Sequence, residues 1–491
     1  MSDRGISRRT VLGGVAAVGA GSMWGGLGPV STAAAAEGPY LPTSQSLSQH
    51  PTARWYKDAK FGIFIHWGPY SVPAWGVNVA YHGAEWYWYA MHIDDPGLDQ
   101  TYQHHLQTYG ASFNYDDFIP QFRAENYDPG AWIRLFEQAG AQYFVLTSKH
   151  HDGFQLFPNS ASNRNSAVMG PGRDLVGELF EAAKGSRLKR GLYHSLGEFY
   201  NPALQTPPTN PYTGEPVLYT GYKPVADYVS DYLHVMVETL IDRYDPDVLW
   251  ADGEHWHVDL GGGVIFKPKD MDWRGNELLA YYYNNSLNRP APKEVVVNDR
   301  FEASHSDFST VEGPSGYTLR PGSWEACRTL GRSWGYDTNE DPAGIMSSPA
   351  IVKLLVDIVS KNGNLLLNVG PMPDGTIPDW QSERLLDVGR WLDTNGRAIF
   401  GSSAWTRAAD GDLRYTVAGS FNIFGLAWPS SSYLTVPADL PIATDSKIRL
   451  LGAPGHKARF RRTSAAVEID LPSVNPNGDG FPFVLSVDHA R

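Results

Sequence analysis

Short apolar runs alternate with amphipathic segments over about 350 residues of this 491-residue chain, and this alternation restricts the fold more than any other feature. Strands separated by helices pair in parallel, because each helix returns the chain to the same end of the sheet. The runs with the length and composition of buried strands are Phe61–His66, Tyr143–Ser148, Gly191–Ser195, Asp247–Ala251, Glu294–Asn298 and Asn364–Val369. The sequence therefore predicts either a (β/α)8-like barrel or an open, doubly wound sheet.

The segments between the runs have the caps and the spacing of helices. Asp128–Gln138 and Asp174–Ala183 each begin with an aspartate that can cap a helix, and 225–243 and 349–361 repeat apolar residues every three or four positions. A glycine-rich dinucleotide motif is absent after the first strand-like run, which disfavours the open sheet. We therefore expect a barrel of the TIM type, regular or irregular.

The pattern changes near residue 400. Short alternating runs, separated by Gly, Pro, Asn and Asp, are typical of antiparallel strands. They are Leu413–Val417, Phe421–Leu426, Lys447–Leu451 and Phe481–Val487. The chain is therefore predicted to divide into a barrel domain at 37–401 and a C-terminal β-sandwich at 402–491. Residues 201–224, rich in Pro, Thr and Tyr, are expected to form a long surface loop near the catalytic face.

Residues 1–36 are predicted to be a twin-arginine signal peptide. Ser7–Leu12 contains the paired arginines, an apolar stretch follows, and Ala33–Ala36 offers a cleavage site before Glu37. The apolar stretch is interrupted by glycines, so no membrane span is expected in the mature chain. The single cysteine excludes an intrachain disulfide. We expect a secreted protein, and its net charge of −13 argues against nucleic acid as a partner.

Polar and aromatic residues follow the strand-like runs where the strands should end. Tyr143–Ser148 leads into Lys149, His150, His151 and Asp152, four ionisable groups for which a buried strand has no structural need. The other ends carry His66, Trp67, His194, Glu198, Trp250, Asp252, Asn298, Asp299 and Arg300. In a parallel barrel these ends meet on one face, where catalytic residues collect. The sequence therefore predicts an enzyme with its active site on this face.

These residue types suit a carbohydrate substrate. Trp rings stack on the C–H faces of sugars, and His, Asn and Arg side chains hydrogen-bond hydroxyl groups. Cleavage of a glycosidic bond needs two carboxyl groups, and several strand ends supply them. The adjacent His150 and His151 could instead ligate a metal, although no spaced partner motif accompanies them. Cys327 could be a nucleophile, but a lone cysteine is more often an inert buried side chain.

Five motifs resemble those of glycoside hydrolase family 29, the α-L-fucosidases. They are Phe61–Gly68, Ala84–Tyr87, Lys149–Gly153, Val248–Gly253 and Asn298–Arg300, and the resemblance covers about residues 50–400 with Asn362–Pro371 near its end. The resemblance implies a barrel followed by a β-sandwich. It also implies fucosylated glycans or oligosaccharides as substrates, with no cofactor and no metal.

The resemblance also implies roles for individual residues. Asp252 corresponds to the family nucleophile, and Glu312, in Asp307–Glu312, is expected to be the acid/base, with Glu325 as its rival. A retaining double displacement would follow. The residues expected to bind fucose or to line its pocket are His66, Glu85, Trp86, His150, His151, His194, Trp250 and Arg300. His194 stands where many relatives have Tyr.

Two other functions remain open on the sequence. A fucose-binding protein could keep the pocket without catalysis, although the presence of both carboxylates argues against it. Metal-dependent hydrolysis at His150 and His151 predicts inactivation by a chelator.

Overall fold

The computed structural model describes residues 38–77, 82–253 and 266–488. The predicted signal peptide at 1–36 lies outside the described residues. All of the described residues belong to one compact unit.

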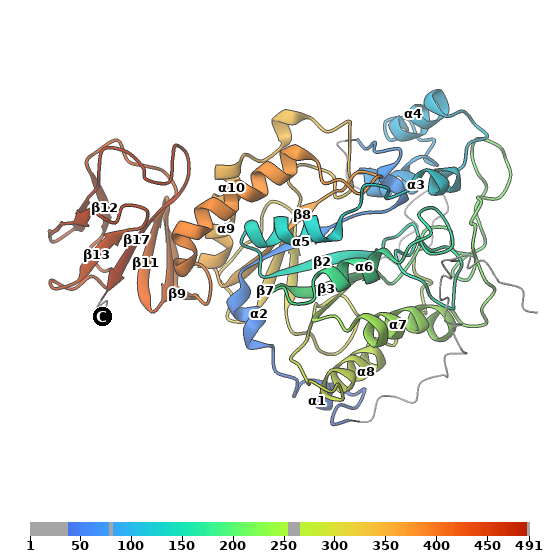
Figure 1. Cartoon of the computed structure of the whole chain (residues 1–491), viewed down its shortest axis with the longest axis horizontal. Coiled ribbons are helices and arrows are strands. Elements are labelled where there is room, and N and C mark those ends of the chain that lie inside the picture. Colours follow the sequence, from blue (N-terminus) through green and yellow to red (C-terminus); the bar gives the residue numbers. More distant parts are fainter. Residues whose placement is uncertain (1–37, 78–81, 254–265, 489–491) are drawn as a thin grey trace, which may run out of the picture. The chain divides into compact units, whose positions relative to one another are not determined.

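Eight parallel strands form the central sheet, in the order β5-β4-β3-β2-β1-β8-β7-β6 (Figure 1). Because β1 lies between β2 and β8, the sheet curls so that the first and last strands become neighbours. This confirms the predicted barrel in an irregular form, whose two edge strands are β5 and β6. The strands are β1 (Phe61–Ile65), β2 (Tyr143–Lys149), β3 (Lys189–Ser195), β4 (Val248–Asp252), β5 (Val296–Val297), β6 (Ser309–Glu312), β7 (Trp324–Arg328) and β8 (Gly363–Val369).

Successive side chains of each strand point to opposite faces of the sheet, and this separates two apolar clusters. On β3, Leu192 packs in the cluster beneath the helices, whereas Tyr193 belongs to the cluster inside the barrel. The interior cluster includes Tyr56, Phe64, Tyr143, Val145, Tyr193, Val248, Trp250, Val296, Phe308, Cys327 and Leu366. The same alternation decides which residue at each strand end faces the active-site side of the barrel.

Helices cover the outer face of the sheet, and Figure 1 shows α5 and α6 over β2 and β3. The predicted caps are present, since Asp128 accepts a hydrogen bond from Ala131 N at 2.8 Å and Asp174 one from Gly177 N at 2.9 Å. The helices are α1 (Ser44–Leu47), α2 (Arg54–Ala59), α3 (Tyr87–Ala90), α4 (Gln100–Thr108), α5 (Pro129–Gln138), α6 (Leu175–Ala182), α7 (His234–Tyr244), α8 (Gly275–Leu287), α9 (Ser348–Ser360) and α10 (Asp379–Asn395). A π-helical turn, Val229–Leu233, leads into α7.

One helical stretch, Pro342–Ser360, is long and apolar enough to cross a membrane by length and composition. Its apolar residues, among them Ile351, Leu355 and Val359, are buried in the main core of the barrel. The stretch is therefore explained as a core helix, and no other helix in the described part of the chain passes the same test.

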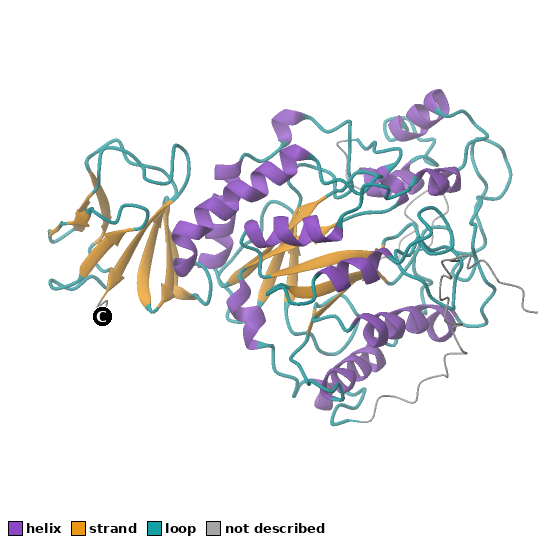
Figure 2. Cartoon of the chain, in the orientation of Figure 1, coloured by secondary structure: helices purple, strands orange, loops and turns teal. Residues whose placement is uncertain are grey.

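After α10 and a short 3-10 turn, the described chain consists of strands and loops (Figure 2). Two antiparallel sheets, of order β14-β13-β17-β11-β10-β9 and β12-β16-β15, share a separate apolar core. This confirms the predicted C-terminal antiparallel sandwich, while its boundary at 401 and 402 stays a prediction. The strands are β9 (Ser403–Asp410), β10 (Leu413–Ala418), β11 (Ser420–Gly425), β12 (Tyr433–Pro437), β13 (Lys447–Leu450), β14 (Lys457–Ala458), β15 (Phe460–Arg462), β16 (Ala466–Asp470) and β17 (Phe483–Asp488).

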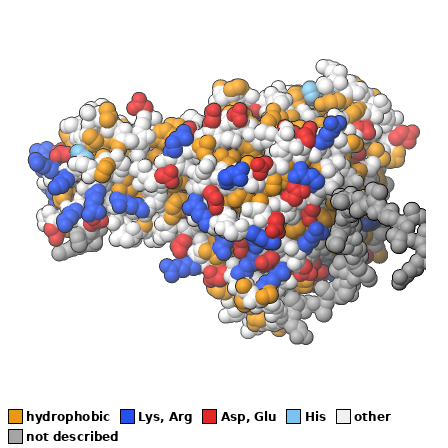
Figure 3. Space-filling model, in the orientation of Figure 1, with side chains coloured by type: hydrophobic (Ala, Val, Ile, Leu, Met, Phe, Trp, Pro, Cys, Tyr) orange, Lys and Arg blue, Asp and Glu red, His pale blue; other side chains and the backbone are white. Residues whose placement is uncertain are grey.

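Acidic and basic side chains are interspersed over the face of the molecule shown in Figure 3. The acidic side chains on this face are therefore not gathered into a single patch.

Candidate active site

A cavity of about 910 Å³ opens at the carboxyl ends of the barrel strands. It brings together nine residues that the sequence proposed for the site: His66, Glu85, Trp86, His150, His151, Trp250, Asp252, Arg300 and Glu312. Two proposed residues, His194 and Glu325, do not line it. The predicted clustering of strand-end residues thus corresponds to a real concave site.

Asp252, at the end of β4, is held by three neighbours. Its Oδ1 accepts a hydrogen bond from Arg300 Nη1 at 2.7 Å, and its Oδ2 accepts one from the Tyr193 hydroxyl at 2.7 Å. His151 Nε2 lies 3.6 Å from Oδ2. Burial alone would raise the pKa of Asp252, but Arg300 above all, then His151 and Tyr193, bring the pKa below its ordinary value. Asp252 is therefore ionised at neutral pH.

Arg300 joins the two candidate catalytic carboxylates. Its Nη1 contacts Asp252, and its Nη2 donates to Glu312 Oε2 at 3.1 Å. Its Nε donates to Thr310 Oγ1 at 3.0 Å, and its guanidinium lies 4.8 Å above the centre of the Trp250 ring. Such a planar fork fixes the direction of both carboxylates. Glu312 is the more accessible of the two, with 48% of its side chain exposed against 17% for Asp252.

Glu325, the rival acid/base, lies in the barrel interior below the cavity. Its side chain is fully buried and accepts hydrogen bonds from the Tyr143 hydroxyl at 2.5 Å, the Tyr56 hydroxyl at 2.9 Å and Trp250 Nε1 at 2.9 Å. Burial raises the pKa of Glu325 despite these donors. Because its oxygens are occupied and it does not line the cavity, Glu325 supports Trp250 from beneath rather than facing a substrate.

His66 and His151 are fixed in tautomers that present an acceptor nitrogen. His66 Nδ1 lies 2.7 Å from the carbonyl oxygen of the Asn368 side chain, whose amide nitrogen donates to Trp334 O. His151 Nδ1 lies 2.7 Å from Ser195 Oγ, which itself donates to Gly197 O. Both Nδ1 atoms must then donate, which leaves each Nε2 with a lone pair. Burial lowers the pKa of His66 to about 3 and that of His151 to about 4.

His150 stacks on Tyr193, with ring centroids 5.7 Å apart and an interplanar angle of 13°. Its Nδ1 is buried and has no hydrogen-bond partner among the described residues. Burial, with the neighbouring His151 and His66, lowers the pKa of His150 well below its ordinary value. A neutral imidazole with an unused buried nitrogen is suited to bind a ligand hydroxyl.

Glu85 and Trp86 form another wall of the cavity. Glu85 Oε2 accepts hydrogen bonds from Ser333 Oγ at 3.0 Å and from the backbone nitrogens of Trp334 and Gly335 at 3.1 Å each. Three donors on one oxygen leave Oε1 as the atom that can bind a hydroxyl. Trp86 lies edge-on to His151 at 5.3 Å between ring centroids, so a flat ring borders the imidazoles.

The structure does not place His194, which was predicted to contact the sugar, in the lining of the cavity. Tyr193 points into the barrel, so the alternation of β3 turns His194 to the outer face. There His194 Nδ1 lies 3.0 Å from Ser148 Oγ. The residue of this strand that reaches the cavity is Tyr193. Because side chains alternate between the two faces of a strand, the interior positions of β3 could have identified it.

Lys149 and Asp152, which flank the two histidines, are structural. Lys149 Nζ lies 2.6 Å from Glu198 Oε1, and both side chains are fully buried. Glu198 Oε2 also accepts from Asn201 Nδ2 at 2.7 Å and from the Tyr219 hydroxyl at 2.5 Å, which anchors the predicted loop 201–224 beside the site. Asp152 accepts from the Tyr115 hydroxyl at 2.7 Å, and burial raises its pKa to about 6.

Several lining residues were not foreseen from the sequence. Trp334, Asp337 and Arg328 line the cavity together with Tyr193. Trp334 lies 5.0 Å from His66 between ring centroids, and burial raises the pKa of Asp337 to about 7. Trp334 and Asp337 lie in the connection between β7 and α9, where no apolar run marks a strand end.

The described residues include one His/Asp group with the spacing of metal ligands: His50, His305 and Asp307. None of the three lines the cavity. Among the described residues, His150 and His151 belong to no group of three possible metal ligands. The residues present therefore do not favour metal-dependent hydrolysis at that pair.

Comparison with known proteins decides the family. The family model for alpha-L-fucosidase matches residues 29–397. This chain belongs to the α-L-fucosidase family. Tissue alpha-L-fucosidase of Bos taurus is 36% identical over 453 residues, which is 90% of this chain and 86% of that protein. The chain is an α-L-fucosidase, a glycoside hydrolase, as the sequence motifs predicted.

Solved structures of α-L-fucosidases have the same fold. The Thermotoga maritima alpha-fucosidase in complex with fucose has 36% sequence identity and a TM-score of 0.76, with 91% of this chain and 100% of that chain covered. The complex of the same enzyme with a mechanism-based inhibitor has 36% identity and a TM-score of 0.76, with 91% and 99% covered.

Removal of the Tyr193 hydroxyl will shift the pH dependence of this α-L-fucosidase. That hydroxyl lowers the pKa of Asp252, so Tyr193→Phe raises this pKa and moves the acid limb of kcat/KM to higher pH. A hydrogen bond to a charged group is worth about 1.5–3 kcal/mol, so kcat/KM should also fall about tenfold or more. Tyr244→Phe is the control, because that hydroxyl contacts Asp174, outside the cavity. An unchanged acid limb in Tyr193→Phe would contradict the view that ionisation of Asp252 sets this limb.

Proposed function

We propose that this protein is a secreted, retaining α-L-fucosidase that releases terminal α-L-fucosyl residues from glycans by double displacement. One observation carries the proposal: a single guanidinium, that of Arg300, holds Asp252 on one side and Glu312 on the other. Two carboxylates fixed at one point of a cavity can reach the same glycosidic bond. A relative, the Thermotoga maritima alpha-fucosidase, forms a complex with a mechanism-based inhibitor.

In the first step, an Asp252 oxygen attacks the anomeric carbon of the fucosyl residue. The bond to the leaving oxygen breaks as Glu312 donates its proton to that oxygen, and a fucosyl ester of Asp252 forms. In the second step, Glu312 takes a proton from water, whose oxygen attacks the same carbon. The ester bond breaks, and fucose leaves with its original anomeric configuration.

The division of labour follows from the surroundings of the two carboxylates. The lowered pKa of Asp252 keeps it ionised, as a nucleophile must be. Glu312 is half-exposed and contacts the same cation. The more exposed position also suits the residue that must meet both the leaving group and water.

The sugar would be held by neutral acceptors and flat rings. The Nε2 of His66 and the Oε1 of Glu85 can accept hydrogen bonds from fucose hydroxyls, and His151 lines the same cavity. Trp86 and Trp334 border the same space and can pack against the C–H face of the ring. Fucosylated glycans are therefore the proposed substrates. The twin-arginine segment supports export of the folded enzyme.

The test follows the first sugar product of an aryl α-L-fucoside by proton NMR. A retaining enzyme releases α-L-fucose first, and mutarotation to the β-anomer follows. A fluorinated fucosyl fluoride should label the peptide that contains Asp252, as detected by mass spectrometry. β-L-fucose as the first product, or a label on another residue, would refute the proposed mechanism.

A further inference from the structure

The barrel has one seam where strand pairing stops. β5 and β6 are the two edges of the central sheet and do not pair with each other as strands. Asp307, two residues before β6, bridges the seam to Val297 of β5. Its backbone nitrogen donates to Val297 O at 3.0 Å, and its side-chain Oδ2 accepts from Val297 N at 2.8 Å. One residue thus replaces the missing strand ladder with two hydrogen bonds to a single partner.

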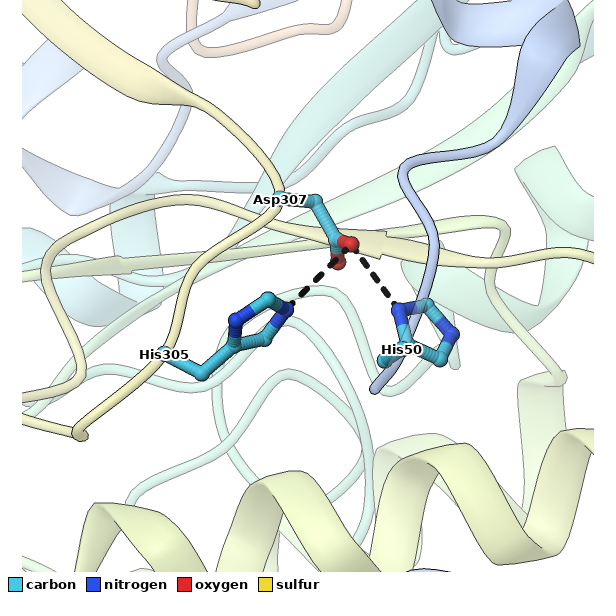
Figure 4. A group of neighbouring side chains, drawn as sticks. All are labelled: His50, His305 and Asp307. Atoms are coloured by element: carbon cyan, nitrogen blue, oxygen red, sulfur yellow. Dashed lines mark hydrogen bonds and ion pairs between the residues drawn. The ribbon is translucent and has the colours of Figure 1, made fainter. Parts of the chain in front are cut away.

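The Asp307 side chain has no exposed surface, and several elements converge on it. Oδ2 also accepts from the Tyr283 hydroxyl of α8 at 3.0 Å. Oδ1 lies 2.9 Å from His50 Nδ1 and 3.8 Å from His305 Nε2, as Figure 4 shows. Thr52 Oγ1 donates to the Asp307 backbone oxygen at 3.0 Å. Asp307 therefore ties β5, α8 and the segment before α2 to the start of β6.

The residues that follow connect this tie to the active site. Phe308 fills the barrel interior and stacks on Tyr56 at 4.5 Å between ring centroids. Thr310 accepts from Arg300 Nε at 3.0 Å. Glu312 ends β6 at the cavity, and Gly313, with a φ of 97°, follows directly. Because a glycine follows Glu312 immediately, its position depends on the restraints that precede it and on pairing with β7.

We propose that Asp307 is a positioning residue for the acid/base Glu312. By closing the seam between β5 and β6, it sets where β6 runs and so where Glu312 meets the leaving group. The inference rests on the acid/base role of Glu312 under the proposed function. It gives the Asp307–Glu312 motif a physical meaning: its first residue closes the barrel and its last residue faces the substrate.

A bound cation would be a different explanation of this group. The ligand atoms of His50, His305 and Asp307 lie within 4.8 Å of one another. However, Oδ1 is at hydrogen-bond distance from His50, and two further donors occupy Oδ2. Hydrogen bonds therefore already account for both oxygens of Asp307. We attribute the link between β5, α8, the segment before α2 and β6 to these hydrogen bonds.

The experiment measures kcat/KM of Asp307→Asn with two substrates, dinitrophenyl and phenyl α-L-fucoside. The dinitrophenolate leaves without a proton, whereas the phenolate depends on the general acid, whose contribution is about 10²–10⁴-fold. Displacing Glu312 should lower kcat/KM for the phenyl substrate by about tenfold or more, and for the dinitrophenyl substrate by less than about threefold. An equal loss with both substrates, or no loss with either, would overturn the inference.

The matched control is Asp247→Asn. Asp247 is also buried, and its Oδ2 also accepts a backbone hydrogen bond, from Arg190 N at 2.9 Å, but it lies at the amino end of β4. This variant should lose stability and keep the wild-type ratio between the two substrates. If Asp307→Asn fails to fold, Tyr283→Phe removes one donor to Oδ2 and leaves the carboxylate in place. It should change the ratio in the same direction by a smaller factor, and an unchanged ratio would count against the inference.

Glu312→Ala, measured in parallel, separates this inference from the proposed function. It should lose activity on the phenyl substrate, keep it on the dinitrophenyl substrate, and regain turnover with azide. If Glu312→Ala shows no dependence on the leaving group, the proposed acid/base assignment fails. If Glu312→Ala shows this dependence and Asp307→Asn does not, the positioning role alone fails. A stoichiometric metal ion that is lost in His305→Ala would also overturn the hydrogen-bonded tie.

Discussion

Asp252→Ala will lower kcat for an aryl α-L-fucoside by on the order of 10⁴-fold or more, because it removes the carboxylate proposed to form the fucosyl ester. Asp252 is the carboxylate that Arg300, Tyr193 and His151 together keep ionised. Fucose affinity, measured by calorimetry, should change far less than kcat, because the histidines and tryptophans that line the cavity remain. Stopped assays with long incubation give the residual rate.

Rescue of Asp252→Ala by azide tests the role of Asp252 through a gain of activity, which is more specific than a loss of activity. Azide can occupy the space left by the missing carboxylate and attack the anomeric carbon, so Asp252→Ala should form a fucosyl azide of inverted configuration. The control is Asp299→Asn, since Asp299 lines the same cavity but is exposed and contacts Thr310 rather than the proposed reaction centre. Turnover of Asp252→Ala near the wild-type rate would remove Asp252 from the mechanism.

Lys149→Ala is expected to destabilise the protein by about 3–5 kcal/mol, because it leaves a buried charge without a partner. Lys149 and Glu198 are both fully buried, and their ion pair measures 2.6 Å. Glu198 also holds Tyr219 of the 201–224 loop, so the variant should loosen the wall behind His150 and His151. Activity should therefore fall together with stability. Denaturant unfolding followed by circular dichroism measures the free energy.

Two further variants test whether the buried charge is the cause. Lys149→Met combined with Glu198→Gln removes both charges and should recover much of the stability lost in Lys149→Ala. The comparison is Arg407, which pairs with Asp439 and Asp410 near the surface, since Arg407→Ala should cost less than about 1 kcal/mol. A loss in Lys149→Ala no larger than that in Arg407→Ala would show that the Lys149–Glu198 pair contributes little.

The sequence predicted the part of the barrel whose strands are apolar. β1 to β4 and β8 are buried runs, and hydrophobic periodicity finds such strands. The sequence did not predict β6 and β7, because neither strand is a buried apolar run. Specific contacts hold their side chains instead. β6 lies at the edge of the sheet and is partly exposed, and the interior positions of β7 hold Glu325 and Cys327.

The candidate site was predicted to the extent that strand ends define it. His66, His150, His151 and Asp252 follow or end apolar runs and do line the cavity. The family resemblance added Glu85, which no strand pattern would have found, and the acid/base role expected for Glu312. His194 does not line the cavity, whereas Tyr193 does, because a shift of one residue along a strand exchanges the two faces of the sheet.

The low pKa values of the site histidines have a consequence for the transition state. As the glycosidic bond breaks, the anomeric centre of the sugar gains positive charge, as in an oxocarbenium ion. Imidazolium groups around the ring would repel that charge, but His66 and His151 stay uncharged until the pH approaches about 3 and 4. The sugar therefore develops its charge among uncharged imidazoles, opposite the anionic Asp252.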